Sequence, residues 1–193
     1  GPAAGRIRHR MPGPHPARLH IASYNIYRAR YLDRAGPRGG TLRDDLSSLA
    51  EVRAADILLL QEATVMPPAA GRPGCDAVRE LAAVWGAVAP GNTAFVGSRA
   101  GAGRWGVGAL CRGPARFTSL WLPRPRWSPW QRAALFVESG PWLVGTLHLE
   151  VWPIGAPARR AQMRTVLDFL AAQDEAQGRP VVVLVRPETI QVE

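Results

Sequence analysis

The chain has 193 residues, of which 47% are hydrophobic and 20% charged, and its net charge is +9 because 24 Arg outnumber 15 acids. This length and composition predict one globular domain with a sizeable core, and no apolar stretch is long enough to cross a membrane. Cys75 and Cys111 are too few for a disulfide framework, which leaves one bridge or, as we favour, two buried thiols.

The positive charge is concentrated at the start of the chain. Residues 1–40 contain eight Arg and one acid, Asp33, whereas the remainder is nearly balanced. Such an arm suits a polyanion, either nucleic acid or an anionic membrane surface, although a solvated tail without a partner is an equal alternative. We expect residues 1–17 to be a disordered basic arm or a vector-derived remnant. They lack the apolar core of a signal peptide, so the expected location is the cytoplasm.

The first predicted strand covers residues 19–27 and closes with Asn25 and Ile26. A polar, Gly-rich loop over residues 28–40 separates it from a predicted helix. Thr41 is the expected N-cap of that helix, and its apolar residues recur at helical spacing.

The second predicted strand is the apolar run Ile57–Leu60, which ends abruptly at Gln61 and Glu62. A buried helix turn is the competing interpretation, but the run is too short for a helix. A carboxylate at the end of a central strand lies where open α/β sheets bind ligands. The alternative is that Glu62 is the first solvated residue after a core strand. If the two strands are neighbours, Asn25 and Glu62 lie side by side.

The rest of the chain alternates between strands and helices. A helix over 156–177 is expected to point Met163, Val166, Leu167 and Leu170 inward and to end at Gly178. Ser139 and Gly140 predict a hairpin turn. The other predicted elements are a helix over 75–85 and strands over 93–97, 105–111, 115–122, 131–138, 141–149 and 181–185.

Two of these segments carry a resemblance to a known family. The segment IASYNI, followed by DILLLQE, is similar to the opening of the endonuclease/exonuclease/phosphatase superfamily of metal-dependent phosphoesterases. The resemblance implies an α/β fold, a four-layer, deoxyribonuclease I-like two-sheet sandwich flanked by helices. It implies a partial domain over residues 18–185, with the second half incomplete.

The resemblance also assigns a candidate site. Phosphodiester hydrolysis needs a divalent metal, a positioned water and donors for the phosphate oxygens. By resemblance, Glu62 is a ligand of Mg²⁺ or Mn²⁺, and Asn25 lies at the metal or contacts the phosphate. His148, at a strand end, matches a phosphate-contacting histidine, whereas the alternative is a buried structural histidine. Arg160 and Gln162 match a family pattern at the start of the long helix, and we expect them to be mainly structural.

The match breaks after residue 184. The family carries Gly-Asp-X-Asn there, but this chain has Val185, Arg186, Pro187 and Glu188, and the family's closing Asp-His motif is not found in the 193 residues. Residues 186–193 therefore form an atypical tail. Either the sequence is truncated or frame-altered, or it belongs to a diverged relative. The sequence predicts a nuclease-like phosphodiesterase or phosphatase with impaired activity, or alternatively a catalytically inactive module that binds nucleic acid or another polyanion.

Two further features concern partners. Between Trp121 and Trp130, Arg and Trp alternate on a Pro-rich loop. These side chains either stack on bases or lie at a lipid interface, or, as we favour, the Trp residues pack between the sheets while Arg124 and Arg126 are solvated. The expected partner is a phosphate-ester substrate, with nucleic acid or membrane lipid as its source. The exposed edge of the strand over 181–185 is expected to promote self-association. No protein partner can be inferred.

Overall fold

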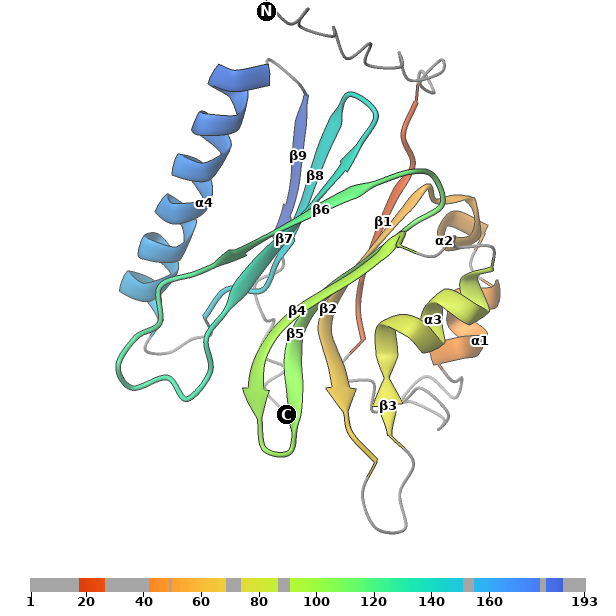
Figure 1. The fold of residues 1–193 in the computed structure, drawn as a ribbon, viewed down its shortest axis with the longest axis horizontal. Helices are drawn as coiled ribbons and strands as arrows, with labels where there is room; N and C mark the ends of the chain where they lie inside the picture. The colour runs from red at the N-terminus through yellow and green to blue at the C-terminus, as the bar shows by residue number, and fades with distance from the viewer. Residues whose placement is uncertain are drawn as a thin grey trace, which may run out of the picture.

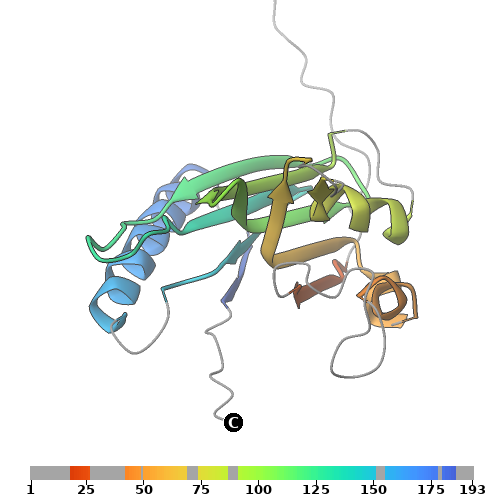
Figure 2. The same cartoon turned by 90° about the horizontal axis from the view of Figure 1, so that it is seen from below.

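Two β-sheets pack face to face, and helices cover their outer faces (Figure 1). The computed structural model describes residues 18–26, 42–48, 50–68, 74–86, 91–150, 155–177 and 180–185. The view from below shows the two sheets between α4 on one side and α1 and α3 on the other (Figure 2). The predicted two-sheet α/β sandwich is therefore confirmed.

The first sheet contains the N-terminal strands. Its order is β1-β2-β5-β4, with β1 parallel to β2 and the other pairs antiparallel, and β3 pairs with the far end of β2. Three helices cover its outer face. The elements are β1 (Ile21–Asn25), α1 (Leu42–Ser48), α2 (Ala50–Ala54), β2 (Ile57–Met66), β3 (Cys75–Asp76), α3 (Ala77–Trp85), β4 (Thr93–Ala100) and β5 (Gly103–Cys111).

The second sheet has the order β6-β7-β8-β9, and the pair β8–β9 is parallel. Helix α4 covers its outer face, where the rings of Phe169 and Phe136 lie 4.5 Å apart. The elements are β6 (Arg116–Trp121), β7 (Ala133–Ser139), β8 (Trp142–Leu147), α4 (Ala156–Gln177) and β9 (Val181–Val185).

Strand β2 is buried on both faces, as its continuous apolar run predicts. Ile57 and Leu59 pack between the two sheets, whereas Leu58 and Leu60 pack under the helices. All four side chains are fully buried. The alternation of successive side chains thus divides one strand between two cores.

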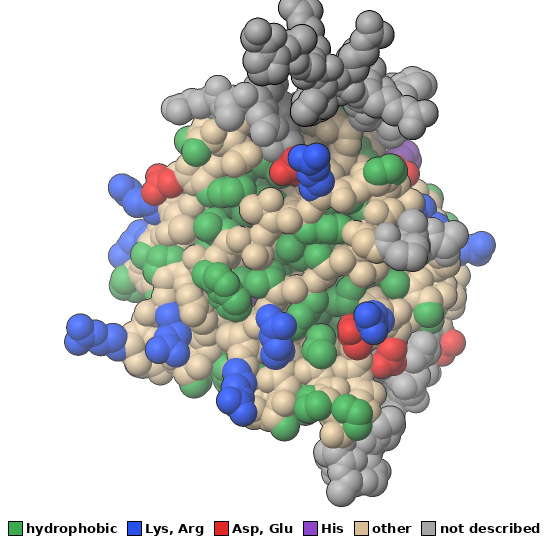
Figure 3. Space-filling model, in the orientation of Figure 1, with side chains coloured by type: hydrophobic (Ala, Val, Ile, Leu, Met, Phe, Trp, Pro, Cys, Tyr) green, Lys and Arg blue, Asp and Glu red, His purple; other side chains and the backbone are tan. Residues whose placement is uncertain are grey.

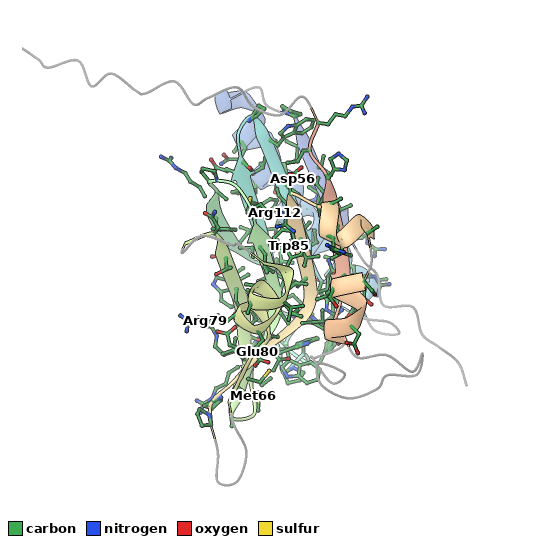
Figure 4. The ribbon with its side chains drawn as sticks, turned by 90° about the vertical axis from the view of Figure 1, so that its right-hand side faces the viewer. Asp56, Met66, Arg79, Glu80, Trp85 and Arg112 are labelled. Atoms are coloured by element: carbon green, nitrogen blue, oxygen red, sulfur yellow. The ribbon has the colours of Figure 1, made fainter. Side chains whose placement is uncertain are left out.

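Arg112 fastens the helices to the first sheet. Its guanidinium lies 4.3 Å from the centre of the Trp85 ring and donates to the carbonyl oxygens of Arg53, Ala55 and Trp85 (Figure 4). These carbonyls belong to the last turns of α2 and α3 or follow them. A cation here satisfies acceptors that a helix end leaves open and complements the negative end of the helix dipole.

Several details differ from the sequence predictions. Cys75 and Asp76 form β3 rather than the first turn of a helix, because Asp76 caps α3 by accepting from the backbone N–H of Arg79. Leu167 is not inward but 56% exposed, and Phe169 packs on the sheet in its place. Strand β2 does not end at Glu62 but continues to Met66.

Other predictions lie outside the described residues. These are the basic arm over 1–17, the loop over 28–40, the Thr41 cap and the tail over 186–193. Cys75 and Cys111 are both thiols, of which only Cys111 is fully buried. No helix among the described residues is long and apolar enough to span a membrane.

Candidate functional site

Glu62 occupies a β-bulge in the middle of β2. In the pairing with β5, Gln61 lies opposite Val107 and Ala63 opposite Gly106, so Glu62 has no partner in the ladder. Its φ angle is +55°, the only positive φ among the described non-glycine residues. A left-handed non-glycine residue costs about 1–3 kcal/mol and persists where its surroundings enforce it.

The bulge decides where the Glu62 carboxylate points. Without it, residue 62 would follow Leu58 and Leu60 to the helix side of the sheet. The extra residue lets Ala63 take that place in the helix-side core. Glu62 instead meets Asn25, which shares a face of β1 with Ile21 and Ser23, on the side of the second sheet. The bulge therefore re-aims a carboxylate that is only 5% exposed.

Asn25 and Glu62 are in direct contact. Asn25 Nδ2 donates a hydrogen bond of 2.9 Å to Glu62 Oε1. The pairing of β1 with β2 places Asn25 opposite Gln61 and brings the two side chains together. The predicted juxtaposition is confirmed, although only Asn25 lies at a strand end, whereas Glu62 lies at a bulge within β2.

Gln61 connects this pair to the second sheet. Its Nε2 donates to Ser23 Oγ and to Thr146 Oγ1, each at 2.8 Å. Thr146 belongs to β8 and lies two residues before His148. Since Gln61 directly precedes Glu62, this bond places Glu62 and His148 at the same end of the two packed sheets. Strands β1, β2 and β8 all run downward in Figure 1.

His148 directly follows β8 and is 4% exposed. Its ring lies edge-on to Trp105 of β5, with the ring centres 5.3 Å apart. Trp105 in turn contacts Trp130, at 5.5 Å, from the loop between β6 and β7. The histidine is thus packed into an aromatic cluster that joins both sheets.

A buried ion pair lies beside this cluster. Arg132 and Glu150 are 4% and 3% exposed, and Arg132 Nη2 lies 3.1 Å from Glu150 Oε1. The Arg132 guanidinium also stacks 4.5 Å from the centre of the Trp105 ring. Gln162 of α4 accepts from the backbone N–H of Glu150, which supports its predicted structural role. Arg159, not Arg160, donates to the carbonyl oxygen of Glu150.

A small cleft opens between the sheets at this point. Its internal volume is about 10 Å³, which is roughly the space that one water molecule needs. Arg132 Nε and Nη1 are buried and have no hydrogen-bond partner among the described residues. Guanidinium donors in a cleft suit an anionic oxygen. Sequence reasoning missed Arg132; the polar pair Gln131-Arg132 before an apolar strand was the available signal. The lining residues are Trp105, Gly106, Val107, Gln131, Arg132, Ala133 and His148.

Glu62 and Asn25 fit a hard divalent cation. Mg²⁺ takes oxygen ligands, commonly one or two protein carboxylates with waters completing its shell. The buried Glu62 carboxylate, oriented by the Asn25 amide, supplies such a ligand. Within the described part of the chain, no three His, Cys, Asp or Glu side chains form a metal-binding group. A metal here would rest on Glu62 and retain several waters.

Known structures share this architecture at low sequence identity. An endonuclease/exonuclease/phosphatase from Beutenbergia cavernae aligns with a TM-score of 0.59 and 21% identity, over 78% of this chain and 43% of that one. The human Nocturnin catalytic domain with bound sulfate anion gives 0.52 and 16%, over 86% and 62%. A humanized D. rerio TDP2 with 14 mutations gives 0.51 and 20%, over 86% and 60%.

No family model matches the chain, and no curated protein matches it. The chain also spans less than two thirds of the length of each of these three structures. The similarity to these structures establishes the architecture that the segments IASYNI and DILLLQE predict. The chain has the endonuclease/exonuclease/phosphatase fold.

Proposed function

We propose that this chain is a metal-dependent phosphodiesterase-type hydrolase, nuclease-like, whose activity is impaired. The observation that carries the proposal is the Glu62 carboxylate, held at a strained bulge by Asn25. Strain of this kind concentrates at functional sites, and Glu62 lies within a strand where no turn requires it. The fold supports the same chemistry, because superfamily enzymes generally depend on a divalent metal.

Each residue has a distinct role in this proposal. Glu62 binds Mg²⁺ or Mn²⁺, and Asn25 orients the Glu62 carboxylate. Arg132 and His148 line the cleft and donate to the oxygens of a phosphate group. When bound, the metal would neutralise phosphate charge and make the phosphorus atom easier to attack.

The sequence after β9 is the reason to propose impaired activity. Arg186 stands where the family has the Asp of Gly-Asp-X-Asn, and Glu188 stands in place of its Asn. A cation at the sequence position where the family has this Asp should weaken Mg²⁺ binding by repulsion. Positioned acid–base groups are commonly worth about 10²–10⁴ in rate, so losing them is costly.

The decisive experiment measures Mg²⁺-dependent cleavage of plasmid DNA and of a chromogenic phosphodiester. The 193-residue chain should show weak cleavage that Glu62→Gln abolishes. Arg186→Asp combined with Glu188→Asn should restore metal affinity before it restores turnover. The control Asp168→Asn changes an exposed carboxylate on α4 and should have no effect. Cleavage that survives Glu62→Gln would contradict the proposal.

The second candidate is a catalytically inactive module that binds nucleic acid or another polyanion. The exposed Arg and Trp side chains of the loop between β6 and β7 favour it. Its binding should fall steeply with salt and should not need metal. A metal titration of nucleic-acid binding separates the two candidates, because only the hydrolase gains affinity through Glu62.

A further inference from the structure

The end of β6 and the loop that connects it to β7 expose aromatic side chains that the fold does not need for its core. Trp127 is 48% exposed and Trp121 is 44% exposed, so the prediction that these residues pack between the sheets is wrong. Arg124 and Arg126 are exposed, as predicted. An indole that remains in water gives up the large free energy that its burial would contribute. Two such exposed residues close together in the sequence therefore suggest a binding surface.

The loop is held in place by the fold. Gln162 Nε2 of α4 donates to the carbonyl oxygen of Pro123 at 3.0 Å, and Leu122 is fully buried. The backbone N–H groups of Leu122 and Ser128 donate to the carbonyl oxygens of Arg132 and Pro125. Three prolines further restrict the backbone. The backbone of this loop therefore has little conformational entropy left to lose on binding.

The loop is connected to the candidate site. Trp130, at its end, contacts Trp105, which contacts His148. Figure 1 shows the loop at the lower left of the molecule and the tip of the β4–β5 hairpin at the lower end of the first sheet.

The hairpin adds positive charge. Arg99 and Arg104 are exposed and lie directly opposite each other in the β4–β5 ladder. Arg104 Nε donates to the Gly97 carbonyl oxygen at 3.1 Å, and its guanidinium lies 5.3 Å from the centre of the Phe95 ring. Seven Arg and no acid occur between Glu80 and Glu138. The lower left of Figure 3 accordingly shows Arg side chains among hydrophobic ones, without acidic neighbours.

We propose that Trp121, Arg124, Arg126 and Trp127, with Arg99 and Arg104, form a surface that binds single-stranded nucleic acid. Because it names the substrate class of the site, this inference rests on the proposed function. Indoles stack on unpaired bases while Arg residues follow the phosphates. Two indoles separated by Arg and Pro offer stacking faces, whereas insertion into a membrane favours a contiguous apolar face.

Binding of fluorescein-labelled dT20 to the full chain, measured by anisotropy in EDTA, tests this surface. Trp127→Ala should weaken binding about 5- to 150-fold, since one stacked base is worth about 1–3 kcal/mol, and Trp127→Phe should retain most of it. Arg124→Gln should lower the slope of log K against log salt by about 0.7. The control Arg79→Gln changes an exposed Arg on α3 and should lower this salt slope less than Arg124→Gln does.

Matched probes identify the ligand class. Trp127→Ala should leave binding of inorganic polyphosphate unchanged, because polyphosphate has no bases to stack. Equal losses for dT20 and polyphosphate would overturn stacking. A loss only for anionic phosphatidylserine vesicles would overturn the nucleic-acid assignment in favour of a membrane. Unchanged dT20 binding in Trp127→Ala, with an unchanged melting temperature, would overturn the surface.

Separate measurements distinguish a failure of the proposed function from a failure of this surface. In EDTA, Glu62→Gln should not alter dT20 binding, and Trp127→Ala should not alter Mn²⁺ affinity. A Trp127-dependent complex without Glu62-dependent cleavage would support the surface while contradicting the hydrolase. Glu62-dependent cleavage with no role for Trp127 would contradict the surface alone.

Discussion

Asn25 Nδ2 donates to Glu62 Oε1 at 2.9 Å, across two parallel strands that lie 37 positions apart in the chain. The bond exists because a bulge turns Glu62 away from the helix-covered face. The two residues consequently act together: Glu62 provides charge, and Asn25 fixes its orientation. This arrangement yields a first prediction about metal binding.

Glu62→Gln should abolish Mn²⁺ binding, because it removes the charge but preserves the shape of the side chain. Asn25→Ala should weaken binding by about 10- to 100-fold, the usual effect of losing a group that orients a metal ligand. Titration calorimetry or Mn²⁺ electron paramagnetic resonance measures both. Equal affinities for Asn25→Ala and the unmodified chain would show that Asn25 does not position Glu62.

The second prediction concerns the strain at the bulge. Glu62→Gly should be more stable than Glu62→Ala by about 1 kcal/mol, because glycine adopts a positive φ without steric cost. Urea denaturation in EDTA measures the difference. The same comparison at Ala63, which lies in the ladder, should favour alanine. Greater stability of Glu62→Ala would mean that the bulge relaxes when the carboxylate is removed.

The third prediction concerns the buried pair Arg132–Glu150. Removing either partner by Arg132→Met or Glu150→Gln should destabilise the fold by about 3–5 kcal/mol, because a buried charge is left unpaired. The double variant should lose less unfolding free energy than the two single variants lose together. A double-mutant cycle by denaturant unfolding gives the coupling free energy. A coupling near zero would show that the two charges are stabilised independently.

The fourth prediction concerns the contact of α3 with β5. A Cβ on Gly108 would lie 2.5 Å from Val78 Cγ2. Gly108→Ala should therefore destabilise the fold by about 1–3 kcal/mol through overpacking. Adding Val78→Ala to Gly108→Ala should recover part of the loss, although Val78→Ala alone is destabilising. If the losses of the two single variants simply add in the double variant, the contact with Val78 does not cause the destabilisation by Gly108→Ala.

The fifth prediction concerns the two thiols. Burial raises the pKa of the Cys111 thiol, while a hydrogen bond with Ser139 opposes the shift. Less thiolate is then present at mildly alkaline pH, so iodoacetamide should modify Cys111 more slowly than half-buried Cys75. Mass spectrometry of Cys75→Ser and Cys111→Ser variants measures each rate separately. Faster modification of Cys111 would show that local opening exposes it.

The local pattern of the sequence determined most of the fold. The continuous apolar run Ile57–Leu60 predicted a strand buried on both faces, as β2 is. The run Val181–Val185 predicted a strand as well, but residues 181–184 of β9 are half-buried and not fully buried. The helix predicted over 156–177 has the bounds of α4. Asn25 and Glu62 were predicted to be neighbours because each follows or closes such a run. These features depend on residues close in sequence, whose periodicity records the burial of each face.

Only the tertiary structure decided the direction of Glu62 and the surroundings of His148. The alternation rule assigns Glu62 to the helix side, and the bulge that reverses it depends on pairing with β5. The pair Arg132–Glu150 and the exposure of Trp127 likewise arise from contacts between distant segments. A sequence states which side chains are present, but packing between the sheets determines which of them meet and which remain in solvent.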